Sequence, residues 1–269
     1  MSNDNFDGLD KKKKKILGII PARMAATRFP NKPMQLIEGI PMIGHCYFRS
    51  RMCEMLDEVY VATCDSEIYD YIKGIGGNAV MTADTHERPT ERSAEALVNI
   101  EKAFPESKFD IVVMIQGDEP LIEPKMISDV IEPILFDGNE VSNLMLPIMN
   151  IEDVLNSNHV KVVISVDGKA LYMSREPIPS ATKYNHTINY YKQIGLMAFT
   201  REAILNFINL APTELEIIES IDMNRFIQNK IQIQMRITRF EPVAVDIKED
   251  LDIVKNKMKV DSLFPLYRY

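Results

Sequence analysis

The first half of the chain alternates short apolar runs with amphipathic stretches. The apolar runs, each predicted to form a β-strand, cover residues 15–20, 58–63, 78–82, 110–116 and 142–149. Apolar side chains at helical spacing predict a helix over residues 125–135 with one face on a sheet: Ile127, Val130, Ile131, Ile134 and Leu135. Strands that alternate with helices in this way are typical of an α/β fold, a mainly parallel sheet flanked by helices.

The second half of the chain has a different pattern. Residues 160–174 have strand propensity on both sides of Asp167-Gly168, a hairpin turn signal, and residues 189–199 form another extended run. We therefore expect an antiparallel insert at about residues 155–200. Helices are also predicted over residues 213–229 and 247–258, and strands over residues 231–237 and 243–246.

Composition limits the class of protein. The chain has 269 residues, 46% of them hydrophobic and 26% charged, which is ordinary for a globular protein. Since no apolar run approaches the roughly 18 residues that a membrane-spanning helix requires, we expect no membrane insertion. A net charge of -8 argues against a nucleic-acid partner, because a nucleic-acid binder presents a dominant basic surface. We interpret residues 1–15, which end in five lysines, as a disordered tail and residues 16–269 as a single domain.

Cysteine usage bears on both compartment and metal. The chain has three cysteines, Cys46, Cys53 and Cys64, and none of them forms a CxxC pair. This argues against a disulfide framework and a zinc site, and it fits a reducing, cytoplasmic location. We therefore expect oxygen ligands for any metal ion.

Three cations follow the first predicted strand. Arg23, Arg28 and Lys32 lie within ten residues of one another in a chain that is acidic as a whole. Ligands of open α/β sheets bind beyond the carboxyl ends of the strands, and cations beside backbone N–H groups suit a polyphosphate. The alternative is three solvated surface cations, and charge alone does not decide between the two.

Two aspartates follow predicted strands. Asp118 comes after Gly117 in the sequence QGDEP, and Asp246 ends the run 243–246 just before a predicted helix. Mg²⁺ prefers one or two carboxylates and fills its remaining positions with water and phosphate oxygens, so these acids could share a metal ion, although a polar turn would also explain the first. The phosphate-loop and dinucleotide-binding glycine patterns are both absent, which argues against a P-loop NTPase and an NAD-type dehydrogenase.

Seven blocks of sequence resemble, in order and spacing, the cytidylyltransferases that activate 3-deoxy-manno-octulosonate (Kdo), the CMP-Kdo synthetases. The blocks are IIPARMAATRFPNKPMQLIEGIPMIGH, THERPTERSAEAL, IQGDEPLI, ALYMSREPIP, IGLMAFTREAILNF, LEIIESIDMNRFI and VAVDIKEDLDIV, within about residues 16–258. The resemblance implies a Rossmann-like nucleotidyltransferase fold and a reaction of CTP with a sugar acid, using Mg²⁺, that yields a CMP-sugar acid and pyrophosphate. It also implies a homodimer built through the antiparallel insert and a role in lipopolysaccharide biosynthesis.

The resemblance assigns nucleotide and metal sites residue by residue. The catalytic residues it implies are Arg23, Lys32 and Asp118, and the metal ligands are Asp118 and Asp246. The nucleotide-binding residues it implies are Ala22, Arg23, Thr27, Arg28, Lys32, Thr90, Arg92 and Gln116. For Thr90, the alternative interpretation is a helix N-cap.

The resemblance also assigns residues to the sugar acid: Gln116, Arg175, Gln193, Glu216 and Glu219. Arginine can bind a carboxylate with two parallel hydrogen bonds, and two glutamates at i and i+3 can accept hydroxyls from one helical face. The alternative for Glu216 and Glu219 is a solvated acidic face.

The sequence departs from the family pattern on the sugar side. Arg88-Pro89 stands where these enzymes usually have Ser-Gly, and residues 193–197 read QIGLM where the Kdo enzymes typically have HLGIY. The predicted acid is Kdo, and the alternatives are 8-amino-Kdo and a nonulosonic acid. A glycosyltransferase of similar architecture should carry a DxD motif, whereas in QGDEP the residues after Asp118 are Glu and Pro. A nucleotide-binding regulator without turnover is the other alternative, and the presence of both Asp118 and Asp246 argues against it.

Overall fold

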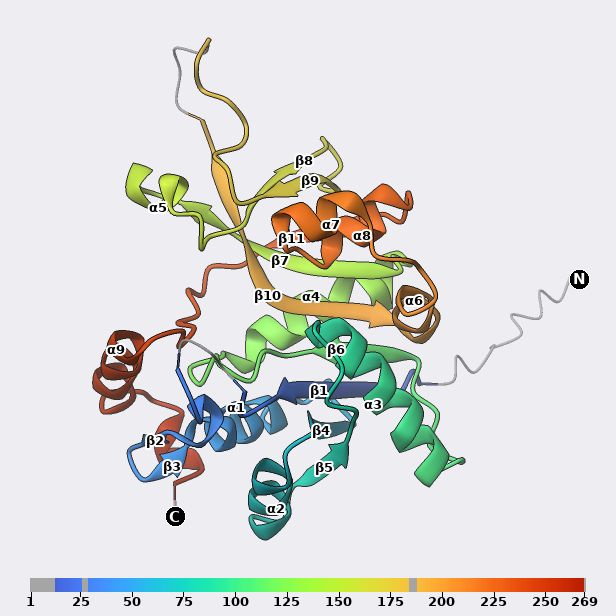
Figure 1. The fold of residues 1–269 in the computed structure, drawn as a ribbon, viewed down its shortest axis with the longest axis vertical. Helices are drawn as coiled ribbons and strands as arrows, with labels where there is room; N and C mark the ends of the chain where they lie inside the picture. The colour runs from blue at the N-terminus through green and yellow to red at the C-terminus, as the bar shows by residue number, and fades with distance from the viewer. Residues whose placement is uncertain (1–12, 26–28, 184–187, 269) are drawn as a thin grey trace, which may run out of the picture.

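In the computed structural model, nine strands form one mixed sheet in the order β11-β7-β10-β6-β1-β4-β5, with β8 and β9 attached beside β10. Figure 1 shows this sheet running down the molecule from β8 and β9 at the top to β5 at the bottom. The structure describes residues 13–25, 29–183 and 188–268, and the statements below concern these residues.

The lower part of the sheet is parallel. Its strands are β1 (Ile16–Ala22), β4 (Glu58–Thr63), β5 (Asn78–Met81) and β6 (Ile111–Met114). Every residue of β1 is buried, as expected for a central parallel strand covered on both faces. β7 (Val141–Ile148) and β11 (Ile233–Ile237) also pair in parallel, so the prediction of a mainly parallel sheet flanked by helices is confirmed.

The antiparallel strands are continuous with this sheet. β8 (Lys161–Ile164) and β9 (Ala170–Ser174) form the predicted hairpin, in which Gly168 adopts a φ of +78° that suits glycine. β10 (Tyr190–Thr200) pairs with β8 near its start and then runs between β6 and β7. The predicted insert therefore ends inside the central sheet and not beside it.

Helices cover both faces of the sheet. One face packs on α3 (Pro89–Ala103), α6 (Arg201–Phe207) and α8 (Met223–Gln228), and the other packs on α1 (Met42–Arg51), α2 (Ser66–Gly74) and α4 (Pro124–Asp137). The remaining elements are α5 (Ile151–Leu155), α7 (Glu214–Glu219), α9 (Lys248–Met258), the short strands β2 (Leu36–Ile37) and β3 (Ile40–Pro41), and the 3₁₀ helices η1 (Lys32–Met34) and η2 (Phe264–Leu266). The helix predicted over residues 125–135 is α4.

Two sequence predictions need correction. Residues 243–246 are described and form no strand, and the backbone hydrogen bond from Val245 N–H to the Asp118 carbonyl joins them to a loop and not to a strand edge. The helical region 213–229 is two helices, because Ser220 adopts a left-handed φ of 55° between α7 and α8.

The structure describes only part of the predicted N-terminal tail. Of the predicted tail, residues 1–12 lie outside the described residues, whereas Lys15 already bonds to Asp110, donating its N–H to Oδ2 at 2.8 Å. Within the described ranges, no helix is both long enough and apolar enough to cross a bilayer.

Candidate active site

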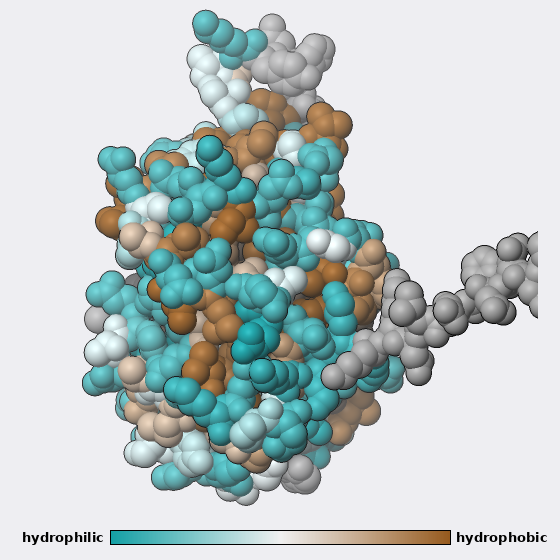
Figure 2. Space-filling view, turned by 90° about the vertical axis from the view of Figure 1, so that its right-hand side faces the viewer, coloured by the Kyte–Doolittle hydropathy of each residue, from teal (hydrophilic) through white to brown (hydrophobic). Residues whose placement is uncertain are grey.

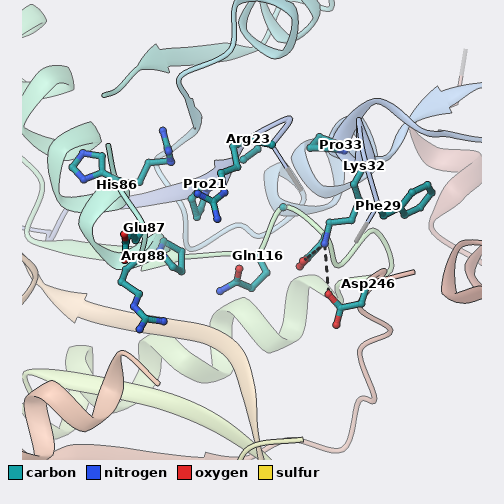
Figure 3. Close-up of a pocket in the computed structure, with 16 residues that line it drawn as sticks. Pro21, Arg23, Phe29, Lys32, Pro33, His86, Glu87, Arg88, Gln116 and Asp246 are labelled. Carbon is teal, nitrogen blue, oxygen red and sulfur yellow. Dashed lines mark hydrogen bonds and ion pairs between the residues drawn. The ribbon is translucent and has the colours of Figure 1, made fainter. Parts of the chain in front are cut away.

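A cavity of about 360 Å³ opens at the carboxyl ends of β1 and β6, the edge of the sheet where the sequence predicts a ligand. Its lining residues are Pro21, Ala22, Arg23, Ala25, Phe29, Lys32, Pro33, His86, Glu87, Arg88, Pro89, Arg92, Gln116, Gly117, Asp118 and Asp246. Figure 3 shows Lys32 and Asp246 at one end of this cavity, His86 and Arg88 at the other, and Arg23 and Gln116 between them.

The Lys32 end of the cavity brings together one cation and two carboxylates. Lys32 Nζ lies 2.7 Å from Asp118 Oδ2 and 3.8 Å from Asp246 Oδ1. Lys32 is on η1, Asp118 follows β6, and Asp246 precedes α9, so three distant segments meet here. The structure therefore brings the two predicted metal ligands, Asp118 and Asp246, to the same end of the cavity.

These residues fit a magnesium ion. Both carboxylates lie close to the Lys32 ammonium, so their negative charges favour a cation at this point in the fold. Carboxylate oxygens are also ligands that Mg²⁺ prefers. Within the described part of the chain, no group of three or more His, Cys, Asp or Glu side chains is placed to hold a metal. A metal ion here would therefore complete its shell with water or phosphate oxygens.

Glu119 is a buried carboxyl next to Asp118. Its side chain is packed inside the protein, and Oε2 has no hydrogen-bond partner among the described residues. Burial, together with the negative charge of Asp118, raises the pKa of Glu119 to about 8. Glu119 is therefore mostly protonated at pH 7, and it adds little negative charge to the site.

The opposite end of the cavity contains a buried arginine. The Nη1 group of Arg92 donates to Thr82 Oγ1 at 2.5 Å and to the Ala83 carbonyl at 3.1 Å. Its Nη2 group is buried without a partner among the described residues. Because an unpaired buried donor is costly, this nitrogen is suited to a ligand oxygen.

His86 also lines this end of the cavity and was not predicted from the sequence. Its Nε2 is hydrogen-bonded to Glu95, which also accepts the N–H of Ala83 at 2.9 Å. Burial raises the pKa of Glu95, but hydrogen bonds from Ala83, His86 and Asn99 together lower it below its usual value. The signal that could have identified His86 is its place in the block THERPTER, two residues before Arg88.

Gln116 and Gly117 form the floor of the cavity. A Cβ on Gly117 would lie 2.8 Å from the carbonyl oxygen of Pro21, so only glycine allows the ends of β1 and β6 to approach this closely. The side chain of Gln116 lies against Gly195 of β10. Gln116 therefore stands at the boundary between the parallel strands and the antiparallel strand.

Four predicted sugar-acid residues are not part of the described cavity wall: Arg175, Gln193, Glu216 and Glu219. Glu219 accepts hydrogen bonds from Tyr172, Ser174 and the Arg175 N–H, at 2.7, 2.7 and 2.9 Å. Burial raises the pKa of Glu219, but these bonds together lower it. Arg175 in turn donates through Nε to the Glu219 carbonyl at 2.7 Å.

Glu216 is a buried structural acid in this conformation. It receives Arg225 Nε on Oε2 and Arg225 Nη2 on Oε1, both at 2.6 Å, and Oε2 also accepts the N–H of Thr213 at 3.3 Å. The solvated acidic face considered for Glu216 is therefore wrong, because Arg225, nine residues later, returns to cover it.

Among the predicted nucleotide contacts, the structure brings Ala22, Arg23, Lys32, Arg92 and Gln116 to the cavity. Thr90 is elsewhere: it is fully buried and donates to Asp222 Oδ2 at 2.8 Å. The N-cap interpretation of Thr90 is wrong, because Arg88 is the N-cap of α3 and Thr90 lies in the first turn. Thr27 and Arg28 lie outside the described residues.

Arg88 connects the cavity to the turn between α7 and α8. Its Nη1 donates to Ser220 Oγ at 2.8 Å, and its Nε lies 3.6 Å from Asp222 Oδ1. Burial raises the pKa of Asp222. Arg88, which stands where the resemblance leads us to expect serine, therefore links this end of the cavity to the end of α7, the helix that carries Glu216 and Glu219.

The chain is similar to known proteins over most of its length. A family model described as cytidylyltransferase matches residues 17–237. The 3-deoxy-manno-octulosonate cytidylyltransferase of Geobacter metallireducens is 39% identical over 255 residues, covering 91% of this chain and 98% of that protein. The enzyme of the same name from Geotalea daltonii is 38% identical over 256 residues, with 91% and 98% covered. A solved structure of CMP:2-keto-3-deoxy-manno-octonic acid synthetase complexed with CTP has a TM-score of 0.83 at 30% identity, covering 91% of this chain and 99% of that one.

Proposed function

Because this chain belongs to the cytidylyltransferase family, as a relative of its 3-deoxy-manno-octulosonate cytidylyltransferases, we propose that it transfers the cytidylyl group of CTP to Kdo and releases pyrophosphate. The observation that carries this proposal is the meeting of Lys32 with Asp118 and Asp246 at one end of the cavity. Kdo is favoured over 8-amino-Kdo and a nonulosonic acid because the relatives are named for it.

The charged residues act by electrostatics. The anomeric hydroxyl of the sugar acid loses its proton to water and its oxygen attacks the α-phosphorus, while the bond to pyrophosphate breaks on the opposite side. Positive charge placed before the reaction stabilises the charge that develops on the phosphate oxygens. Arg23 and Lys32 supply this charge from the wall of the cavity. Asp118 and Asp246 would hold Mg²⁺, which neutralises further phosphate charge when it is bound.

The base end of the cavity contains donors with fixed positions. Arg92 is anchored through Nη1, which leaves Nη2 to donate to an oxygen of the base or ribose. A site that hydrogen-bonds one base leaves its polar groups unpaired with another, which disfavours the wrong nucleotide. We propose on this basis that the enzyme prefers CTP.

The test is pyrophosphate release from CTP and Mg²⁺ with a panel of acids: Kdo, 8-amino-Kdo and a nonulosonic acid. We expect turnover with Kdo to be the fastest and turnover with UTP, ATP or GTP to be much slower. Preference for another acid would correct the substrate, and equal rates with UTP would show that the base is not read. Nucleotide binding without turnover on any acid would contradict the proposal that this protein is an enzyme.

We also propose that two copies of this chain form a dimer through the hairpin region. Large apolar side chains are exposed along this part of the sequence: Met149, Ile151, Leu155, Val166 and Leu171. In Figure 2 hydrophobic side chains reach the surface in the upper half of the molecule, the level at which Figure 1 places β8 and β9. Exposed apolar surface of this kind is typical of protein–protein contacts.

Light scattering after size exclusion tests the dimer. Leu155→Glu should lower the measured mass from two chains to one, because it would place a charge in the contact. Val260→Glu is the control, since Val260 is also exposed but follows α9. A monomeric wild-type protein would contradict the proposal.

A cytoplasmic location is proposed because the three cysteines have no CxxC spacing and because the reaction needs CTP.

A further inference from the structure

An irregularity in β10 lies directly behind the cavity. Gln193 pairs with Met145 of β7 and Met197 pairs with Asn143, so β10 advances four residues while β7 advances two. Such bulges bend a strand and change the direction in which side chains point. The residue at the centre of this bulge is Gly195.

Asn143 holds the bulge by its side chain. Its Nδ2 donates to the carbonyls of Ile194 and Leu196, at 2.8 and 2.9 Å, on either side of Gly195. Its Oδ1 accepts a hydrogen bond from Gln193 Nε2 at 2.8 Å. Asn143 is fully buried, so these bonds are not replaced by water when they are lost.

The bulge in turn supports Gln116. A Cβ on Gly195 would lie 2.7 Å from Gln116 Cγ and 3.4 Å from Gln116 Nε2, so the side chain of Gln116 rests on the backbone of Gly195. Figure 3 shows Gln116 in the middle of the cavity, between the Lys32 end and the Arg88 end. The position of Gly195 therefore fixes the position of Gln116.

We propose that Gln193 and Asn143 are positioning residues for Gln116. Gln193 orients the Asn143 amide, Asn143 holds the carbonyls beside Gly195, and Gly195 sets the rotamer of Gln116. This role differs from the direct sugar-acid contact that the sequence predicts for Gln193. The inference rests on the proposed function in one respect, which is that Gln116 contacts the sugar acid.

A double-mutant cycle on Gln193 and Gln116 separates the two roles, because residues that act through one another are not additive. Gln193→Met keeps the length of the side chain and removes its hydrogen bond. We expect it to lower kcat/KM for the sugar acid about tenfold in the wild-type background, the effect of about one hydrogen bond, with little change in the Kd for CTP. In a Gln116→Ala background we expect no further loss. Equal losses in both backgrounds would overturn the proposal and support direct contact.

A conservative variant and a matched control sharpen this test. Gln193→His keeps one N–H donor, so it should recover most of the activity lost in Gln193→Met. Gln234→Met on the edge strand β11 is the control, because it likewise removes a donating glutamine amide, the one that Gln234 Nε2 offers to the carbonyls of Asp167 and Gly168. This control should leave kcat/KM unchanged. A loss equal to that of Gln193→Met would make the effect nonspecific.

A measurement without turnover keeps the inference separate from the proposed function. The side-chain amide signals of Gln116 in a ¹H–¹⁵N spectrum can be identified by their absence in Gln116→Ala. They should shift or broaden in Gln193→Met but not in Gln234→Met, whatever the substrate proves to be. Unchanged Gln116 signals in Gln193→Met would overturn the positioning role. A wild-type enzyme without activity on any acid would contradict only the proposed function.

Discussion

The backbone N–H of Val245 donates a hydrogen bond to the backbone carbonyl of Asp118 at 2.9 Å. This bond joins the segment that carries Asp246 to the loop that carries Asp118. A buried arginine strengthens the connection, since Arg49 on α1 donates to the Ile122 carbonyl at 2.6 Å and to Asp261 Oδ1 at 2.7 Å. The loop after β6 and the chain beyond α9 are therefore held against the same helix.

Replacing this arginine should destabilise the fold. Arg49→Met leaves the partly buried carboxylates of Asp261 and Glu123 without their cation, and we expect the free energy of unfolding to fall by about 3 kcal/mol or more. Urea unfolding measures the change. Arg236→Met is the control, because Arg236 makes a more exposed pair with Glu132 and should cost less than about 1 kcal/mol. Similar losses in the two variants would show that burial of Arg49 is not the cause.

The position of Asp118 and Lys32 at one edge of the sheet could be predicted from sequence, because it depends on local sequence alone. A strand followed at once by an aspartate or a group of cations places those side chains at one sheet edge, whatever the rest of the fold does. Asp118 and Lys32 are at that edge as expected. The contact of Gln193 could not be predicted in this way, because its partner Asn143 lies on another strand. The bulge that follows Gln193 in β10 also breaks the alternation of side chains from which strand contacts are predicted.

Asp118 should matter for turnover and little for stability. Asp118→Asn removes a charge proposed to hold Mg²⁺, and we expect kcat/KM to fall about 100-fold or more. The free energy of unfolding should change by less than about 1 kcal/mol, because the Asp118 side chain is 28% exposed and its pair with Lys32 is screened by water.

A matched variant controls for the loss of one carboxylate. Asp129→Asn on α4 also breaks a pair with a lysine, since Asp129 bonds to Lys125 at 2.5 Å, but Asp129 does not line the described cavity. Its kcat/KM should match the wild type. Normal turnover of Asp118→Asn at limiting Mg²⁺ would show that Asp118 is not a ligand.

Arg92 should control the choice of nucleotide. Arg92→Lys keeps the positive charge but loses the second terminal nitrogen, which we propose donates to CTP. We expect kcat/KM for CTP to fall by about 10- to 100-fold and the ratio of CTP to UTP turnover to fall with it. The ratio is the decisive measurement, because a loss of folded enzyme would lower turnover of both nucleotides equally and leave their ratio unchanged. Arg51→Lys, at an exposed position on α1, is the control, and an unchanged ratio in Arg92→Lys would exclude Arg92 from base recognition.

The sequence pattern failed where a distant partner decides burial. Glu216, Glu219 and Asp222 have the spacing of an exposed acidic face, yet Glu216 is 1% exposed because Arg225 bonds to both of its oxygens. The left-handed residue Ser220 turns α8 back toward α7 and makes this contact possible. Helical periodicity carries no information about such a turn, so the buried pair could be found only in the folded chain.

Stability should depend on pH through Glu101. Arg201 donates to Glu101 through Nε at 2.9 Å and through Nη2 at 2.7 Å, and these hydrogen bonds lower the pKa of Glu101 below its usual value of 4.5. A carboxyl with a lower pKa in the folded state stabilises the fold fully above its unfolded pKa and loses this contribution as the pH falls through the folded value. Glu101→Gln should therefore lower the free energy of unfolding by about 1 kcal/mol at pH 7. In urea unfolding at several pH values, the difference from wild type should shrink below pH 4.5, whereas Glu106→Gln, at an exposed position, should show almost no difference at any pH. A gap for Glu101→Gln that stays constant down to pH 3 would mean that the charge of Glu101 is not what stabilises this contact.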